Sequence, residues 1–382
     1  MTEYNKAFFD QIIDRKSQGA MKWQRYAADV LPLWVADADF YCAPAILNAL
    51  KTHLDQGVLG YRHPDSFLAA TDAVVAWLKR QHQWQVEPEW LVWVPGVIAA
   101  FNMACSVFCE PGDSVLVQRP NYKPLLMAPI LNGLQQETVS TVLEGGRWVL
   151  DFDELERKAA NPRCRLFLLC NPMNPCGTVL NAEEMAKIEA ICLRYDVLLC
   201  SDELHCDLIL SPEAKHIPAG SLPNLAAQTL TIMAANKTFN IAELSTGFVV
   251  IPDKTLRQRF QRGCLGTLPW PSPMGVLATE AAFSDCDDWY QGQLNYLRAN
   301  RQLLVEGLKK HPTLNYQASD ATYLAWVDAS GLECGDVQAA VEAVGVGPSP
   351  GRDFGWNEFF RINFACPRVY IEQAVARLKL LA

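Results

Sequence analysis

The sequence lacks the features of a membrane, secreted or disulfide-bonded protein. No apolar run approaches the roughly 20 residues that a membrane-spanning helix needs, and the N-terminal stretch MTEYNKAFFDQIIDRK has neither the apolar core nor the cleavage site of a signal peptide. The 13 cysteines form no CxxC pair and lie mostly in apolar stretches such as LFLLC and VLLC, where cysteine behaves as a small hydrophobic residue. These absences predict a cytoplasmic protein in a reducing compartment, with no membrane partner.

Positive charge is also scarce. The formal net charge is −9 and no long basic run occurs, so the chain carries no electrostatic footprint for nucleic acid or an anionic membrane. Neither His205 with Cys206 nor any other group has convincing metal-ligand spacing, and no metal is predicted. The 382 residues are 50% hydrophobic and 20% charged, which is typical of a globular protein with more than one core. The expected partners are small molecules and other copies of the chain.

Short apolar runs alternate with segments of helical period through the middle of the chain. Runs that indicate strands are LVWVP (91–95), SVLVQ (114–118), RLFLLC (165–170), VLLCS (197–201) and TLTIMAA (229–235). Strands that are apolar throughout, separated by amphipathic helices, predict an α/β fold with a mostly parallel sheet covered on both faces. In such sheets ligands bind beyond the carboxyl ends of the strands, so the polar residues that follow these runs are the candidates for a site.

Those following residues form a set. The segment Gly96, Val97 and Ile98 opens a helix whose free N–H groups suit an anion such as phosphate, and Tyr122 follows the next strand. The further runs are followed by Asn174 between two prolines, by Asp202 and by Lys237. An anion site, an aromatic face, an amide, a carboxylate and a lysine at one sheet edge match the needs of pyridoxal phosphate.

The chemistry of that cofactor explains each residue type. The amine of Lys237 forms a Schiff base with the cofactor aldehyde and later moves protons. The carboxylate of Asp202 keeps the pyridine nitrogen protonated, because an opposite charge favours the charged form. The ring of Tyr122 suits stacking on the pyridine, and Asn174 can donate to the phenolic oxygen. Each residue alone also fits an ordinary turn or cap, so the prediction depends on their order and spacing together.

The motifs NPMNPCG, SDELH and NKTFN resemble those of the fold-type I pyridoxal phosphate enzymes, the aspartate aminotransferase superfamily. Further stretches resemble the cystathionine β-lyase (C–S lyase) branch, which includes the maltose-regulon modulator protein: LPLWVADADF (31–40), GY (60–61), SDELHCDL (201–208), KTFNIAEL (237–244), TYLAWVD (322–328) and FFRINFACPR (359–368). The resemblance covers nearly the whole chain and implies a large pyridoxal phosphate domain with a smaller α+β domain.

The resemblance also implies further site residues. Arg361 matches the arginine that binds the substrate α-carboxylate, and Trp34 matches a segment that lines the substrate pocket. Tyr61 matches a tyrosine that reaches the cofactor phosphate of the neighbouring subunit, which implies a homodimer with shared active sites. Asn236 and Ser245 are expected at the phosphate, although Ser245 stands where many aminotransferases carry an arginine that the lyase branch also lacks.

Some positions leave alternatives open. His205 fits a hydrogen bond that orients Asp202 or the cofactor ring, and it fits a buried core residue with its hydrogen bonds satisfied equally well. Ala38 stands where the branch often has methionine, and Met173 stands where histidine or glutamine is common. Both positions belong to the expected pocket wall, so the identity of the substrate stays open.

The domain and function predictions follow. The large cofactor domain is expected at 47–278, and the small domain at 1–46 with 279–382, with the site between them. The predicted reaction is β-elimination from cystathionine or a related cysteine S-conjugate, in which Lys237 acts as the general base and Asn174 also contacts the substrate. An aminotransferase is the alternative enzyme, and a regulatory binding protein that retains the fold is the alternative from another class.

Overall fold

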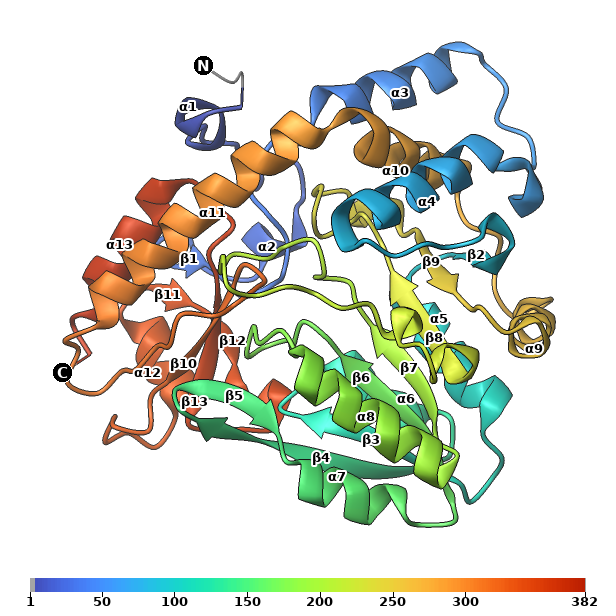
Figure 1. Cartoon of the computed structure of the whole chain (residues 1–382). Helices are drawn as coiled ribbons and strands as arrows, with labels where there is room; N and C mark the ends of the chain where they lie inside the picture. The colour runs from blue at the N-terminus through green and yellow to red at the C-terminus, as the bar shows by residue number, and fades with distance from the viewer. Residues whose placement is uncertain (1–3, 382) are drawn as a thin grey trace.

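The main feature of the computed structural model, which describes residues 4–381, is an eight-stranded sheet in the order β2-β9-β8-β7-β6-β3-β4-β5 (Figure 1). Its strands are β2 (Leu91–Val94), β3 (Ser114–Arg119), β4 (Gln135–Glu144), β5 (Arg147–Leu150), β6 (Cys164–Cys170), β7 (Leu198–Asp202), β8 (Thr229–Met233) and β9 (Gly247–Val250). The pairings show that only β5 and β9 run against the other six strands. Six carboxyl ends therefore meet at one edge of the sheet.

Helices cover both faces of this sheet because successive strand residues point to opposite sides. In β3, Val115 and Val117 join the apolar cluster that includes α5 and α6, whereas Leu116 joins the cluster that includes α7 and α8. Figure 1 shows α7 and α8 in front of the sheet. The helices are α1 (Lys6–Phe9), α2 (Met21–Gln24), α3 (Pro44–Asp55), α4 (Leu68–His82), α5 (Val97–Phe108), α6 (Lys123–Leu131), α7 (Phe152–Ala159), α8 (Ala182–Tyr195), α9 (Lys254–Cys264), α10 (Pro273–Asp285), α11 (Asp287–Leu308), α12 (Val337–Ala343) and α13 (Arg368–Leu378).

A second group of elements combines the two ends of the chain. Its sheets have the orders β10-β13-β12 and β1-β11. Their strands are β1 (Leu31–Pro32), β10 (Leu324–Asp328), β11 (Val346–Gly347), β12 (Ser349–Pro350) and β13 (Phe359–Asn363). The parallel pairing of β1 with β11 brings the N-terminal segment beside the C-terminal one. In Figure 1 the long helix α11 runs from the α3 and α10 group toward these strands.

The α/β prediction is confirmed, with the predicted runs forming β2, β3, β6, β7 and β8. The mostly parallel sheet is confirmed as well, and the structure adds the two reversed strands, β5 and β9, which the apolar pattern did not indicate. The domain boundaries at 47–278 and 279–382 stay a prediction. Within residues 4–381, no helix combines the length and the hydropathy needed to cross a bilayer.

Candidate active site

Five predicted residues lie at the carboxyl ends of five of the six co-directional strands. Gly96 follows β2, Tyr122 follows β3 and Asn174 follows β6. Asp202 is the last residue of β7, and Lys237 follows β8. Parallel strands bring their carboxyl ends to the same edge, so the fold gathers these residues from separate parts of the chain.

The N-terminus of α5 forms the anion-binding end of this edge. Gly96 caps α5 with φ 121° and no side-chain cap hydrogen bond, so the first N–H groups of α5, including those of Val97 and Ile98, have no acceptor within the helix. Ser245 adjoins this turn, because a Cβ built on Gly96 would lie 3.8 Å from the Ser245 carbonyl oxygen. Asn236 adds a buried amide oxygen that has no hydrogen-bond partner among residues 4–381. The free N–H groups of α5 suit a phosphate, whereas the Asn236 oxygen is an acceptor and only the amide nitrogen of that side chain could donate to the anion.

Asp202 is a buried carboxylate with an unexpected partner. Burial raises its pKa from 3.8 to about 6, against the opposing effect of its hydrogen bonds. The hydroxyl of Tyr122 donates to Oδ2 at 2.5 Å, and the Leu204 N–H donates to Oδ1 at 3.2 Å. The sequence suggested the stacking of Tyr122 but contained no sign of this hydrogen bond, because it joins residues 80 positions apart in the chain. Stacking of Tyr122 on a cofactor ring stays a prediction.

Lys237 meets the N-terminal segment at this edge. Its Nζ donates to the carbonyl oxygen of Ala36 at 2.6 Å, and the hydroxyl of Tyr323 donates to the same carbonyl at 3.2 Å. Burial lowers the pKa of Lys237 from 10.5 to about 8, partly opposed by the nearby charge of Asp37. The amine therefore reaches its neutral, reactive form close to physiological pH. Main-chain acceptors such as the Ala36 carbonyl leave no signal in a sequence, and neither Ala36 nor Tyr323 was predicted.

Arg361 is a buried cation whose hydrogen-bond acceptors are all neutral. One terminal nitrogen donates to Asn174 Oδ1 at 2.8 Å, and the other donates to the Trp34 carbonyl at 2.8 Å and to Ser349 Oγ at 3.1 Å. Its Nε is buried without a partner in the described chain. Burial lowers its pKa from 12.5 to about 10. The structure thus brings the predicted residues Trp34, Asn174 and Arg361 together, and it adds Ser349, which the sequence did not suggest.

His205 is buried beside Lys237 and Arg361. Burial, and then the charges of those two residues, lower its pKa from 6.5 to about 3, so the imidazole is neutral. Its ring meets Tyr323 edge-on with centroids 5.9 Å apart. The Nδ1 atom is buried and has no hydrogen-bond partner within residues 4–381, so His205 is not a core histidine with its hydrogen bonds satisfied. A contact with the cofactor stays a prediction.

Tyr61 does not join the site within one chain. Its side chain is 99% exposed, and its ring meets Trp270 edge-on with centroids 6.3 Å apart. A fully exposed ring makes no contact with the buried Asp202 or Lys237 of the same chain. The prediction that Tyr61 acts in a neighbouring subunit requires this separation.

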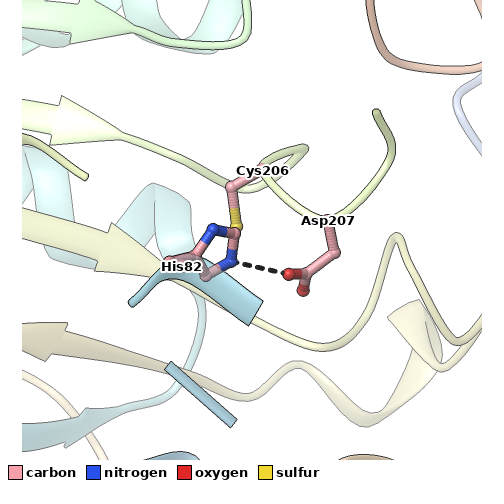
Figure 2. A group of neighbouring side chains, drawn as sticks. All are labelled: His82, Cys206 and Asp207. Carbon is pink, nitrogen blue, oxygen red and sulfur yellow. Dashed lines mark hydrogen bonds and ion pairs between the residues drawn. The ribbon is translucent and has the colours of Figure 1, made fainter. Parts of the chain in front are cut away.

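A second polar cluster includes the two residues that follow His205 in the chain. Figure 2 shows His82, Cys206 and Asp207, whose possible ligand atoms all lie within 4.8 Å of one another. Sequence spacing did not reveal this cluster, because His82 comes from the end of α4. However, Asp207 Oδ1 already bonds His82 Nε2 at 2.8 Å and accepts from Trp77 Nε1 at 3.1 Å. Burial raises the pKa of the Cys206 thiol well above its usual value. These contacts describe a hydrogen-bonded junction that fastens α4 to the loop of His205.

The buried polar atoms around Lys237 fit a bound cofactor. Buried atoms without a partner include Asn236 Oδ1 and Thr238 Oγ1, on either side of Lys237, and Nδ1 of His205. Buried polar atoms are rarely left without partners, so a polar ligand with several hydrogen-bonding groups is expected among them. A phosphate end, a lysine and a buried carboxylate match pyridoxal phosphate.

The fold and this site together define the class of fold-type I pyridoxal phosphate enzymes. Residues 28–378 match the family model described as aminotransferase class I and II. The chain belongs to this family, as its motifs predicted.

Similarity to individual proteins shows which branch of the family the chain resembles. The chain is 35% identical to cystathionine β-lyase PatB of Bacillus subtilis, over 97% of this chain and 98% of the relative. Among solved structures, OvoB is 40% identical with a TM-score of 0.94, covering 98% of both chains. Cystalysin from Treponema denticola, whose crystal structure contains pyridoxal 5'-phosphate, is 31% identical with a TM-score of 0.93, again over 98% of both chains. The predicted resemblance to the C–S lyase branch is confirmed.

The raised pKa of Asp202 predicts a pH-dependent cost in stability. The folded-state pKa of about 6 exceeds the 3.8 of an unperturbed carboxyl, so the folded chain binds the proton more tightly and its stability falls as the pH rises from about 4 to 6. In protein freed of ligand, Asp202→Asn should therefore increase the free energy of unfolding by about 1 to 3 kcal/mol at pH 7.5. At pH 4 the gain should vanish.

Chemical denaturation at both pH values measures this difference. Asp65→Asn is the control, because the Asp65 side chain is 90% exposed and its substitution should change little at either pH. A ligand-free Asp202→Asn protein that is less stable than the wild type at pH 7.5 would contradict the expected cost of burying this charge.

Proposed function

We propose that the protein is a pyridoxal phosphate-dependent carbon–sulfur β-lyase. It cleaves the Cβ–S bond of cystathionine or a related cysteine S-conjugate and releases a thiol, pyruvate and ammonia. The observation that carries the proposal is Arg361, a buried cation without a carboxylate partner in the described chain, close enough to Lys237 for their charges to interact. An α-amino acid would bring that carboxylate and place its Cα near the amine. The likeness to cystathionine β-lyase PatB supports elimination as the reaction.

Different residues would hold the aldehyde, the ring and the phosphate of the cofactor. Lys237 would bind the aldehyde carbon, and Asp202 would supply the negative charge for the ring nitrogen. When bound, pyridoxal phosphate accepts the electron pair released from the substrate Cα. The remaining contacts are proposed for Gly96, Val97, Ile98, Asn236 and Ser245 at the phosphate, Tyr122 on the ring face, Asn174 at the phenolic oxygen, and His205 near the ring.

The substrate would be gripped by its α-carboxylate. The free Nε of Arg361, with a neighbouring guanidinium nitrogen, offers a planar pair of donors to the two carboxylate oxygens. Asn174 Oδ1 and the Trp34 carbonyl each hold one terminal nitrogen of the guanidinium. This arrangement fixes the substrate's orientation before any proton moves.

Lys237 would then act as the general base. The burial that lowers its pKa to about 8 in the ligand-free chain favours a neutral amine, which could take the proton from the substrate Cα. The Ala36 carbonyl, 2.6 Å from Nζ, can accept a hydrogen bond from the ammonium that results. Departure of the thiolate from Cβ completes the elimination.

The proposed active unit is a homodimer in the cytoplasm. Exposed apolar side chains surround Tyr61, including Val58, Leu59, Leu265 and Trp270, at 72%, 69%, 72% and 49% exposure. A groove runs between residues 59–62 and 268–274. Burial of this apolar surface against a second copy would favour association, and it would take Tyr61 to the partner's phosphate site.

The domain division that we propose keeps 47–278 as the cofactor domain and 1–46 with 279–382 as the small domain. Its support is the contact pattern of the site, since Trp34, Ala36 and Arg361 come from the small domain and meet Asn174 and Lys237 of the large one. A change in the angle between the domains would open or close the substrate side of the site.

An aminotransferase is the second candidate, because the matching family takes its description from that activity. It would need the same lysine, carboxylate and arginine. A protein that only binds a regulatory partner would need no such set, and the retention of all of these residues argues against binding as its only function.

The identity of the cofactor lysine has a direct test. Reduction with borohydride in the presence of pyridoxal phosphate should fix the cofactor to Lys237, and peptide mapping by mass spectrometry should find the label there. Lys237→Ala should lose both the label and all β-elimination. Lys187→Ala, which changes an exposed helix residue, serves as the control and should behave as the wild type. A label on another lysine would overturn the assignment.

The reaction type is tested by turnover without a keto acid. Thiolate is a good leaving group, so a β-lyase should convert cystathionine to homocysteine, pyruvate and ammonia over many turnovers with no keto acid added. An aminotransferase requires a keto acid to complete each cycle. Pyruvate and thiol are measured together over at least ten turnovers per site. Strict dependence on a keto acid would make the aminotransferase the better assignment.

The shared site is tested by mixing subunits. Tyr61→Phe and Lys237→Ala protomers should each be defective alone, whereas a mixed dimer contains one site in which both residues are wild type. Activity should recover to about a quarter of the wild-type value, because half of the dimers are mixed and half of their sites are intact. Subunit exchange is verified by native mass spectrometry. Confirmed exchange without any recovery would exclude the shared arrangement.

A further inference from the structure

The irregular segment at 33–39 supplies main-chain acceptors to both cations of the site. The Trp34 carbonyl accepts from Arg361 at 2.8 Å, and the Ala36 carbonyl accepts from Lys237 at 2.6 Å. This segment follows the two-residue strand β1 and belongs to no helix or strand of its own. Backbone hydrogen bonds hold its two ends, since the N–H of Leu33 donates to Gly347 and that of Asp39 donates to Ala365. Among residues 4–381, no backbone N–H bonds the carbonyls of Trp34 and Ala36, so side-chain contacts help to set their positions.

A buried ion pair makes the central contact. Lys22 Nζ donates to Asp39 Oδ2 at 2.7 Å and to the Asp37 carbonyl at 3.0 Å. The side chains of Lys22 and Asp39 are only 0% and 4% exposed. The indole nitrogen of Trp23 donates to the second oxygen of Asp39 at 2.9 Å. A lysine and a carboxylate this deeply buried are rare unless they are paired, so each fixes the position of the other.

Other contacts hold the same segment from two directions. Arg15 donates to the Ala38 carbonyl and to Asp37 Oδ2, both at 2.7 Å. From the end of β13, the amide of Asn363 donates to the carbonyls of Val35 and Asp37, both at 2.7 Å. The main-chain carbonyl of Lys22 makes a further contact with the segment, because it accepts a hydrogen bond from the Trp34 indole nitrogen at 3.0 Å.

We propose that Lys22 and Asp39 are positioning residues whose buried ion pair holds the carbonyls of Trp34 and Ala36 against Arg361 and Lys237. Neither residue touches the site itself. The effect of this ion pair on catalysis rests on the proposed function. Its effect on the placement of Lys237 in the ligand-free protein is independent of that function. Loss of the Lys22–Asp39 ion pair should move the Ala36 carbonyl away from Lys237. It should also loosen Arg361, which is proposed to bind the substrate carboxylate.

The pKa of Lys237 depends on whether the Ala36 carbonyl stays within hydrogen-bond distance of its amine, so titration of Lys237 tests the proposal. The charged groups around its amine are Asp37, Arg361 and Asp202, and the neutral His205 lies nearby. Asp37 belongs to the held segment, and the other groups do not. When the Ala36 carbonyl and Asp37 move away, the ammonium form loses a hydrogen bond and a favourable charge, so the pKa of Lys237 should fall.

The first experiment is competitive labelling of the ligand-free full chain with trace acetic anhydride between pH 6 and 10. Peptide mass spectrometry follows acetylation of Lys237. The wild-type midpoint is expected near the pKa of about 8, and Lys22→Met should lower it by about one pH unit, the value of one hydrogen bond to a charged group. Circular dichroism at each pH verifies that the variants are folded.

Two further variants serve as a control and as a milder perturbation of the same ion pair. Arg147→Met removes another ion pair, Arg147 with Glu184, whose atoms lie 2.8 Å apart between β5 and α8, and it should leave the midpoint unchanged. Trp23→Phe keeps an aromatic side chain while removing the indole N–H that donates to Asp39 and part of the ring volume. It leaves the Lys22 ion pair in place, so it should lower the midpoint by a smaller amount, and it serves if Lys22→Met does not fold. A midpoint that stays the same or rises in the folded variants would overturn the proposal.

The second experiment uses the enzyme loaded with pyridoxal phosphate and cystathionine. Lys22→Met should lower kcat and raise KM, with kcat/KM reduced about ten- to hundredfold, as expected when reacting groups are misplaced. Arg147→Met should keep both constants. If cystathionine is no substrate even for the wild type, the proposed function fails while the labelling result still decides the role of Lys22. A midpoint shift with unchanged kinetic constants would overturn the catalytic part.

Discussion

Burial of charged groups that lack full partners within the chain is the constraint on which this structure depends. Lys237 and Asp202 lie at one edge of the eight-stranded sheet and Arg361 reaches that edge from β13, and desolvation is the largest cause of the pKa shift in each. Desolvation favours the neutral form of every group, so the lysine approaches a neutral amine and the carboxyl resists ionisation. A ligand that carries a phosphate, a basic ring nitrogen and a carboxylate would supply the missing charges. The site is built to be completed by other molecules.

The N-terminal segment shows how an irregular backbone serves such a site. A helix or strand uses its own carbonyls in its ladder, whereas residues 33–39 leave the carbonyls of Trp34 and Ala36 free to face cations. The cost is that side chains must fix the segment, and Lys22, Arg15 and Asn363 do so. Because the segment belongs to one group of elements and Lys237 to the other, the same contacts join the two halves of the protein.

The sequence predicts well which polar residues meet at the edge of the eight-stranded sheet, for a physical reason. In a parallel sheet, residues that follow strands meet at one edge, so Asn174, Asp202 and Lys237 could be grouped from strand ends alone. Arg361 and Trp34 came from a resemblance, since neither their spacing nor their local pattern indicates a carboxylate site. The hydrogen bond between Tyr122 and Asp202 was missed, as was the junction of His82 with Asp207, because both join distant parts of the chain. The apolar runs indicated a mostly parallel sheet but not that β5 and β9 run against it.

The same burial links stability to chemistry. A solvent-exposed lysine would keep its proton at neutral pH and could not take another from a substrate, so a useful base requires an environment that disfavours its charge. That environment is unfavourable for the folded state as long as the site is empty, because the lysine, the carboxyl and the arginine are all desolvated. Binding of a complementary ligand removes much of this cost, and by linkage it should stabilise the folded chain. Residues that position the acceptors, such as Lys22 and Asp39, therefore affect catalysis through the same electrostatic balance that governs folding.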